Sequence, residues 1–262
     1  MPVNKIIFLQ KDHLNLNNLK AVKDIAHKLD KKLIILLIDI PEEEKEKVKE
    51  ILSESKIHYE IKNQLEYDEA KEEIKSEKPD LLVITQEKVS PLEHIFRTTS
   101  SEKLIKGFEN IDILMLLEDV SSINKILINV DKETSTSFYI YSSYLFASKL
   151  NVEFDFITSF YESFYEYRLR KTHPDEEAKQ LVADLFKEHL EVVRRKIADG
   201  LKGARAELLI IKGDPKKEIP YYARKKGYDL LIINENISDK ESYIENSETS
   251  VAIFKDQIEK GE

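Results

Sequence analysis

The feature that most constrains this chain is a set of apolar runs that occurs twice. NKIIFLQ at Asn4 to Gln10 and NKILINV at Asn124 to Val130 both predict short strands of β-branched and aliphatic residues. KPDLLVI at Lys78 to Ile84 matches GYDLLII at Gly227 to Ile233, and each follows a segment rich in charged residues. The repetition of both runs in the same order indicates a tandem repeat.

Helical segments alternate with these strands. Strands that are apolar throughout indicate a parallel sheet that is covered on both faces, because a sheet with one wet face would alternate apolar and polar residues. Each half is expected to contain five strands joined by right-handed crossovers. The last strand is Ile111 to Leu117 in the first half and Ser250 to Phe254 in the second. The predicted fold class is therefore α/β, with two similar open parallel-sheet, Rossmann-like units in tandem.

The polar link SSINK, Ser121 to Lys125, sets the boundary between the repeats. It predicts a first repeat over residues 1–120 and a second over residues 121–262. After its second strand, the second repeat has an enlarged helical excursion that ends in a long helix at about Asp175 to Gly200. After its fourth strand, the segment ENISDKESYIENSET is short, so this repeat is expected to skip its terminal helix.

Composition excludes several classes of function. The net charge of -9 argues against binding to nucleic acid. Cysteine is absent and the six histidines have no chelating spacing, so neither thiol chemistry nor a metal site is expected. Apolar runs such as Leu33 to Ile40 are shorter than the roughly 20 residues that span a bilayer, and the start of the chain shows no secretory signal. We expect no membrane association and a cytoplasmic location. Abundant Lys and Glu with only 2 Met is a thermophile-like composition.

This arrangement resembles the universal stress protein family in its tandem form, over nearly the whole chain. KILINVDKETST resembles the opening strand of that family. KGDPKKEIPYYARKKGYDLLII, Lys212 to Ile233, resembles the segment in which a Gly-x-Pro turn begins the helix before the fourth strand. The resemblance implies two nucleotide alpha-hydrolase-like units packed as an intramolecular pseudo-dimer. It also implies that the two closing strands, Ile111 to Leu117 and Ser250 to Phe254, pair with each other.

Asp131 and Gly213 are the candidate binding residues of the second repeat. Nucleotide-binding members contact the adenine with an Asp at the end of the opening strand, and Asp131 matches that position. Capping of a helix that begins near Glu133 to Ser135 explains Asp131 equally well. For Gly213 a structural role is favoured, because Gly213 supplies a turn, Asp214 can cap a helix and Pro215 suits its first position.

The phosphate loop of ATP-binding members has the pattern G-x2-G-x9-G-[ST] after the fourth strand. In the first repeat its glycine positions fall on Gln86, Val89 and Thr99, followed by Ser100. The Thr99 and Ser100 hydroxyls are candidate phosphate ligands, but the cap of a helix accounts for them better. The first opening strand also ends at Gln10 and Lys11 without an acid. The second repeat keeps Asp131 but has no glycine in the loop after its fourth strand, so neither repeat has a complete ATP site.

An aromatic segment follows the second strand of the second repeat. Its i, i+4 spacing predicts rings that lie together on a helix. The residues are Phe160, Tyr161, Phe164, Tyr165 and Tyr167. Packing is the favoured role, and a surface for a protein partner or self-association is the alternative.

Nucleophile-elbow, Walker and dinucleotide-binding motifs are absent from the sequence. We therefore expect a non-catalytic stress-response or regulatory protein with degenerate nucleotide sites and no firmly predicted cofactor. One alternative is a protein that binds ATP or AMP through Asp131, with weak ATP hydrolysis. Another is an interaction scaffold that uses the aromatic segment.

Overall fold

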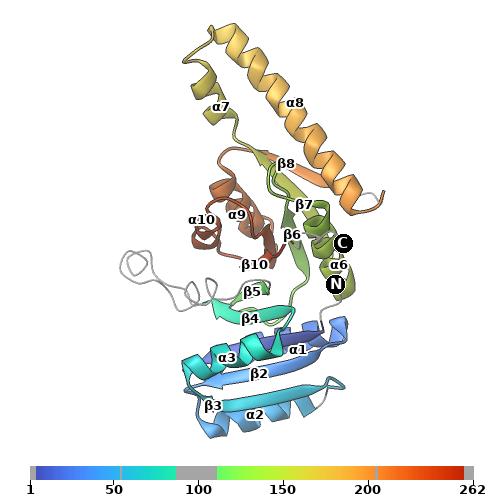
Figure 1. The fold of residues 1–262 in the computed structure, drawn as a ribbon, viewed down its shortest axis with the longest axis vertical. Coiled ribbons are helices and arrows are strands. Elements are labelled where there is room, and N and C mark those ends of the chain that lie inside the picture. Colours follow the sequence, from blue (N-terminus) through green and yellow to red (C-terminus); the bar gives the residue numbers. More distant parts are fainter. Residues whose placement is uncertain (1–3, 54, 87–110, 204–205, 257–262) are drawn as a thin grey trace. The chain divides into compact units, whose positions relative to one another are not determined.

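The fold is known from a computed structural model, which describes residues 4–53, 55–86, 111–203 and 206–256 (Figure 1). The chain divides into two compact units. The first unit comprises Met1–Asn124, Lys149–Asn151 and Ser250–Ile253, and the second comprises Lys125–Ser148, Val152–Thr249 and Phe254–Glu262. A short stretch near the end of the chain therefore belongs to the first unit.

The sheet of the first unit has the order β3-β2-β1-β4-β5-β10. Its strands are β1 (Lys5–Lys11), β2 (Lys32–Ile38), β3 (Tyr59–Leu65), β4 (Leu81–Gln86), β5 (Asp112–Leu117) and β10 (Ser250–Phe254). Its described helices are α1 (Leu16–Leu29), α2 (Glu42–Ser53) and α3 (Tyr67–Glu77). Strands β1 to β5 are parallel, whereas β10 runs antiparallel to β5 with Ala252 opposite Leu114. The predicted pairing of the two closing strands is confirmed.

The sheet of the second unit has the order β9-β6-β7-β8, with all pairs parallel. Its strands are β6 (Lys125–Asn129), β7 (Glu153–Phe160), β8 (Leu208–Lys212) and β9 (Leu230–Asn234). Its helices are α6 (Ser137–Leu150), α7 (Glu162–Leu169), α8 (Asp175–Gly200), α9 (Pro215–Lys225) and α10 (Lys240–Glu245). The long helix predicted after the second strand is α8, and α7 leads into it (Figure 1).

Helix α10 corrects the expectation that the second repeat skips its terminal helix. A helix of six residues is too short to form alone, so contacts with the rest of the unit must stabilise it. Asp239, just before the helix, pairs with Lys216 of α9 at 2.5 Å. Asn246, just after it, donates to the carbonyl of Lys216 at 3.3 Å. These tertiary contacts are not visible in the local sequence pattern.

The duplication is visible in atomic detail at the start of each unit. Asp80, just before β4, accepts a hydrogen bond on its carboxylate from the backbone N–H of Lys5, and its own N–H donates to the carbonyl of Lys5 at 3.1 Å. Asp229, just before β9, makes the same two bonds with Lys125, at 3.0 and 2.9 Å. The same carboxylate therefore fixes the first and fourth strands of both repeats in register. The predicted fold class, two similar α/β units in tandem, is confirmed.

A buried polar network closes the carboxyl end of the first sheet. The Asn18 amide on α1 donates to the carbonyls of Leu117 and Val120, at 2.8 and 3.0 Å. Its Oδ1 accepts from the Thr85 hydroxyl at 2.6 Å. Thr85 in turn accepts from the Gln10 amide at 2.8 Å. The fully buried side chain of Asn18 thus satisfies backbone carbonyls at the end of β5 and just after it, and it joins α1 to β4.

Replacement of Asn18 by Ala should therefore destabilise the protein by about 2–4 kcal/mol, because a buried carbonyl, a partly buried carbonyl and a hydroxyl lose their partner. Urea denaturation followed by circular dichroism measures this change. Asn17→Ala is the matched control, because Asn17 lies next to Asn18 on the same helix and is exposed. Equal stability of the two variants would contradict the role assigned to the network.

Candidate functional site

Ligands of open α/β sheets bind beyond the carboxyl ends of the strands. In the second unit, Asp131 follows β6, Gly213 follows β8, and Asn234 ends β9. Because all four strands are parallel, these three residues come to the same edge of the sheet. This edge is the candidate functional site.

The Asp131 carboxylate caps the turn that follows β6. Its Oδ1 accepts from the backbone N–H groups of Glu133 at 2.9 Å and of Thr134 at 2.8 Å, and from the Thr134 hydroxyl at 3.0 Å. The capping that the sequence offered as one interpretation is therefore present, but at a turn. Helix α6 begins later, at Ser137, and Thr136 caps it by accepting from the N–H of Tyr139 at 3.2 Å.

A second polar group lies at the same edge and was missed by sequence reasoning. The Asp256 carboxylate accepts from the Thr136 hydroxyl and, at 2.8 Å, from the Asn234 amide. Both Asp256 and Asn234 are buried. Asp256 follows the last strand, far in sequence from its partners, so no local motif connects the three residues. Thr136 and Asp256 therefore lie beside Asn234 at the end of β9, the point from which a phosphate loop would start.

Tyr243 of α10 is buried at the same edge, with only 2% of its surface exposed. Burial raises the pKa of its hydroxyl above the ordinary value, and the nearby carboxylates of Asp131 and Asp214 raise it further. The same hydroxyl interacts with the side chain of Asn129, the last residue of β6. The hydroxyl of the buried Tyr243 therefore lies near Asp131 and Asn129.

Gly213 has a backbone φ of +119°, a conformation that residues with a Cβ rarely adopt. Its carbonyl accepts from the Ser159 hydroxyl at 2.9 Å. Asp214 caps α9 through the N–H of Lys216 at 3.2 Å, and Pro215 occupies the first turn of that helix. The structural role expected for this Gly-Asp-Pro segment is therefore present.

Most candidate residues of the first repeat cannot be placed. Thr99, Ser100 and Val89 lie outside the described residues, so their predicted roles stay predictions. The pairings of Ile6 with Leu81 and of Ile126 with Leu230 align the repeats and place Lys11 at the position of Asp131. A basic residue thus replaces the acid.

The aromatic rings of the second unit gather, but not in the predicted pairs. Phe160 stacks on Tyr165 with ring centroids 5.1 Å apart, and Tyr161 contacts Phe164 at 5.6 Å. The i, i+4 prediction was wrong because α7 begins only at Glu162, after the first two rings. Phe160 is buried, as the packing role requires. The other four rings are 36–65% exposed, as an interaction surface would be; they are Tyr161, Phe164, Tyr165 and Tyr167.

A buried histidine borders this aromatic group. His189 of α8 shares a hydrogen bond of 2.8 Å between its Nε2 and the Thr158 hydroxyl, and its ring packs edge-on against Phe160. Burial lowers the pKa of His189, while Asp131 opposes that shift and Lys132 adds to it. The neutral ring is therefore the form that the native state accommodates.

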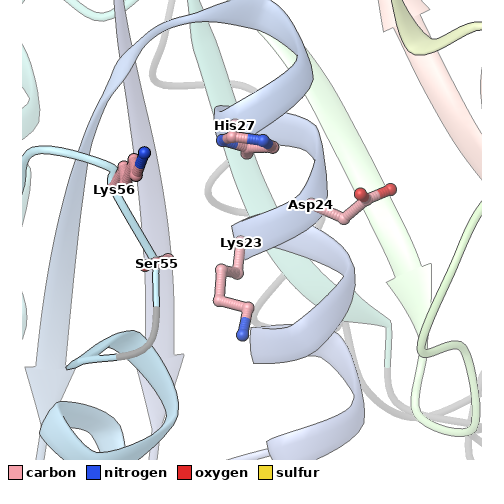
Figure 2. Close-up of a pocket in the computed structure, with 5 residues that line it drawn as sticks. All are labelled: Lys23, Asp24, His27, Ser55 and Lys56. Atoms are coloured by element: carbon pink, nitrogen blue, oxygen red, sulfur yellow. The ribbon is translucent and has the colours of Figure 1, made fainter.

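An open cavity of about 450 Å³ lies in the first unit, lined by Lys23, Asp24, His27, Ser55 and Lys56 (Figure 2). Its polar groups are partly engaged already. Lys23 donates to the carbonyl of Ile51 at 3.1 Å, and Asp24 pairs with Lys28 at 2.8 Å. The cavity lies beside the later turns of α1 and the segment before β3, away from the carboxyl ends of the strands. The usual ligand-binding edge of the sheet is therefore not part of it.

Comparison with solved structures defines the fold. A protein from Pseudomonas aeruginosa UCBPP-PA14 assigned to the universal stress proteins shares 17% identity, with 97% of this chain and 93% of that chain covered and a TM-score of 0.71. A functionally unknown protein from P. aeruginosa PAO1 shares 18% identity, with coverages of 97% and 92% and a TM-score of 0.71. A universal stress protein from Archaeoglobus fulgidus DSM 4304 shares 15% identity, with 96% of both chains covered and a TM-score of 0.57. The chain has the fold of the universal stress proteins over nearly its full length.

No protein-family model matches the sequence, and no curated protein matches it. Within the described ranges, no cluster of His, Asp and Glu side chains is arranged to hold a metal ion. Across those same ranges, none of the helices is both long and apolar enough to cross a membrane.

Replacement of His189 by Gln should weaken the pH dependence of stability. A group whose pKa is lower in the native state than in the unfolded state takes up its proton on unfolding, so native stability falls as the pH drops through the unfolded value. The wild type should lose up to about 1.4 kcal/mol per pH unit more than His189→Gln below about pH 6.5. Urea denaturation at a series of pH values measures both proteins.

The other five histidines are shared by the two proteins, so they cancel in this comparison. Gln can still hydrogen-bond the Thr158 hydroxyl, which keeps the packing change small. Parallel pH profiles for the two proteins would show that His189 titrates alike in both states, against this prediction.

Proposed function

We propose that the protein is a non-catalytic regulatory member of the universal stress proteins. In its second repeat, side chains of the protein itself occupy the position that a bound nucleotide would take. The fold supports the assignment to the universal stress proteins. The side chains of the protein that lie at the carboxyl edge of the second sheet support the lack of a nucleotide there. Stress response and a cytoplasmic location are part of the same proposal.

The observation that carries this proposal is the burial of Tyr243 beside Asn129 and Asp131. A nucleobase at this edge would need an aromatic-sized space next to the acid. In this proposal the buried Tyr243 ring takes that space, and the Asp256 carboxylate stands near the end of β9. A buried carboxylate at this point would also repel the phosphates of a nucleotide. Both features disfavour ATP in the second repeat.

One observation favours the alternative, a protein that binds ATP or AMP through Asp131. The three hydrogen bonds of its carboxylate all end on Oδ1. Oδ2 is therefore the atom that would accept from an adenine amino group. Binding would still require the Tyr243 ring to leave. Weak ATP hydrolysis would follow only from such a rearranged site.

Thermal melting with and without excess Mg-ATP separates the two proposals. A nucleotide at about 100 times its dissociation constant stabilises a protein by about 2.7 kcal/mol. The wild type should show no shift in Tm. Tyr243→Ala should gain a shift, because the substitution opens the space beside Asp131, and the double variant with Asp131→Ala should lose it again. Tyr221→Ala is the matched control, since Tyr221 is an exposed tyrosine of the same unit.

A wild-type shift that Asp131→Ala abolishes would overturn the proposal and establish the nucleotide-binding alternative. A Tyr243→Ala variant that melts cooperatively without any response to ATP would contradict the idea that Tyr243 stands in a nucleotide's place. The Tyr221→Ala control shows whether loss of any tyrosine changes the response.

The interaction scaffold is a second candidate function, favoured by the four exposed rings around α7. Tyrosine and phenylalanine are common anchors of protein interfaces. Two of these rings also make cation–π contacts: Arg168 lies over Phe164 and Lys171 over Tyr167, at 5.4 and 4.2 Å from the ring centres. A partner or a second copy could dock there, and alanine variants of Tyr161 and Tyr165 test it by a change in self-association.

A further inference from the structure

Strand β8 is an edge strand that is apolar except for its last residue. In the part of the chain that the structure describes, β8 pairs only with β7. Its sequence is LLIIK, and Ile210 at its centre is 38% exposed. An exposed apolar edge is a template for another strand, and proteins normally protect such edges with charges, proline or a bulge.

The first repeat protects the equivalent edge, which is β3. The pairings of Ile61 with Ile35 and of Leu208 with Phe156 align the two strands, so that Asn63 stands where β8 has Ile210. The pairing of β3 with its neighbour also shifts register at its end, where Gln64 adopts a positive φ of 57°.

Charged side chains add to this protection of β3. Glu60 pairs with Lys32 at 2.5 Å, and Lys62 contacts Glu77 at 3.3 Å. Strand β8 has apolar residues where β3 has Lys62 and Asn63. Within one chain, two equivalent edges thus differ in the features that prevent strand addition.

The hydrogen-bonding groups of the free edge can be assigned. The carbonyl of Glu207 accepts from Phe156 of β7, and the N–H of Gly213 donates to Phe160 of β7. The backbone N–H and C=O groups of the odd-numbered residues of β8 therefore point toward β7. Successive residues of a strand point their backbone groups to opposite sides, so the N–H and C=O groups of Ile210 point away from the sheet.

We propose that the β8 edge pairs with the β8 edge of a second copy of this chain, antiparallel and centred on Ile210. In that alignment the two Ile210 residues exchange both backbone hydrogen bonds, and Leu208 of each copy lies opposite Lys212 of the other. A two-fold axis satisfies both edges at once, as an isologous interface requires.

Charge at the two ends of the strand favours a second copy over an unrelated strand. Glu207 is exposed at the start of β8, and Lys212 is exposed at its end, where it also pairs with Glu162 at 2.6 Å. Antiparallel alignment puts the acidic start of one strand at the same end of the pair as the basic end of the other, with Glu207 and Lys212 on opposite faces of the sheet. Parallel alignment would place like charges side by side. The edge is thus complementary to itself in one direction only.

Sedimentation velocity of the full chain over a range of concentrations tests this proposal. The wild type should form a dimer, and Ile210→Lys should raise its dissociation constant at least tenfold, because a charge at the centre of the paired edge disfavours strand addition. Ile210→Asn, which introduces the residue that β3 has at the equivalent position, should do the same. Asn63→Lys on β3 is the matched control and should leave the dimer unchanged. Circular dichroism and melting confirm that each variant is folded.

A wild type that stays monomeric at all concentrations would overturn the proposal. So would a dimer that survives both Ile210 variants, or one that is lost in Asn63→Lys. A dimer lost in Tyr165→Ala but kept in Ile210→Lys would assign self-association to the aromatic segment instead. ATP is absent from all of these measurements, so the result does not depend on the proposal for Tyr243.

Discussion

The carboxyl ends of buried parallel strands impose the constraint on which both units depend. Polar groups emerge there from a sheet that is covered on both faces, and each must find a partner. In universal stress proteins that bind nucleotides, the resemblance implies that a ligand occupies this edge. Here side chains of the protein itself supply the partners. Asn18 does so in the first unit, and Asp256 with Thr136 and Asn234 does so in the second.

The two units meet this constraint in different ways, although they share the anchoring of Asp80 and Asp229. The first has Lys11 where the second has Asp131, and it links neutral amides and a hydroxyl of Gln10, Asn18 and Thr85 at this edge. The second keeps Asp131 as the cap of a turn and adds Tyr243 from α10. Retention of the acid therefore does not imply retention of the ligand, because the same carboxylate has a structural task.

Much of this fold could be predicted from local patterns. The apolar runs of β1, β4, β6 and β9 are long enough to predict strands without tertiary information. Helix α8 shows both helical periodicity and acidic residues in its first turn. Helix α10 could not be predicted, since its contacts with Lys216 are tertiary. The partners of Asp256 were equally hidden, because Thr136 lies in another part of the sequence. For Asp131, the sequence supplied both interpretations; the bonds to Oδ1 show the cap, and the contact with a nucleotide stays a prediction.

The central claim is that the chain's own side chains occupy the edge around Asp131. Hydrogen–deuterium exchange of the wild type with and without Mg-ATP tests it most directly, because the backbone amides of residues 131–136 and of α10 lie at this edge. The account predicts the same exchange rates for these amides in both conditions. Strong protection of residues 131–136 on addition of ATP, accompanied by faster exchange in α10, would contradict it.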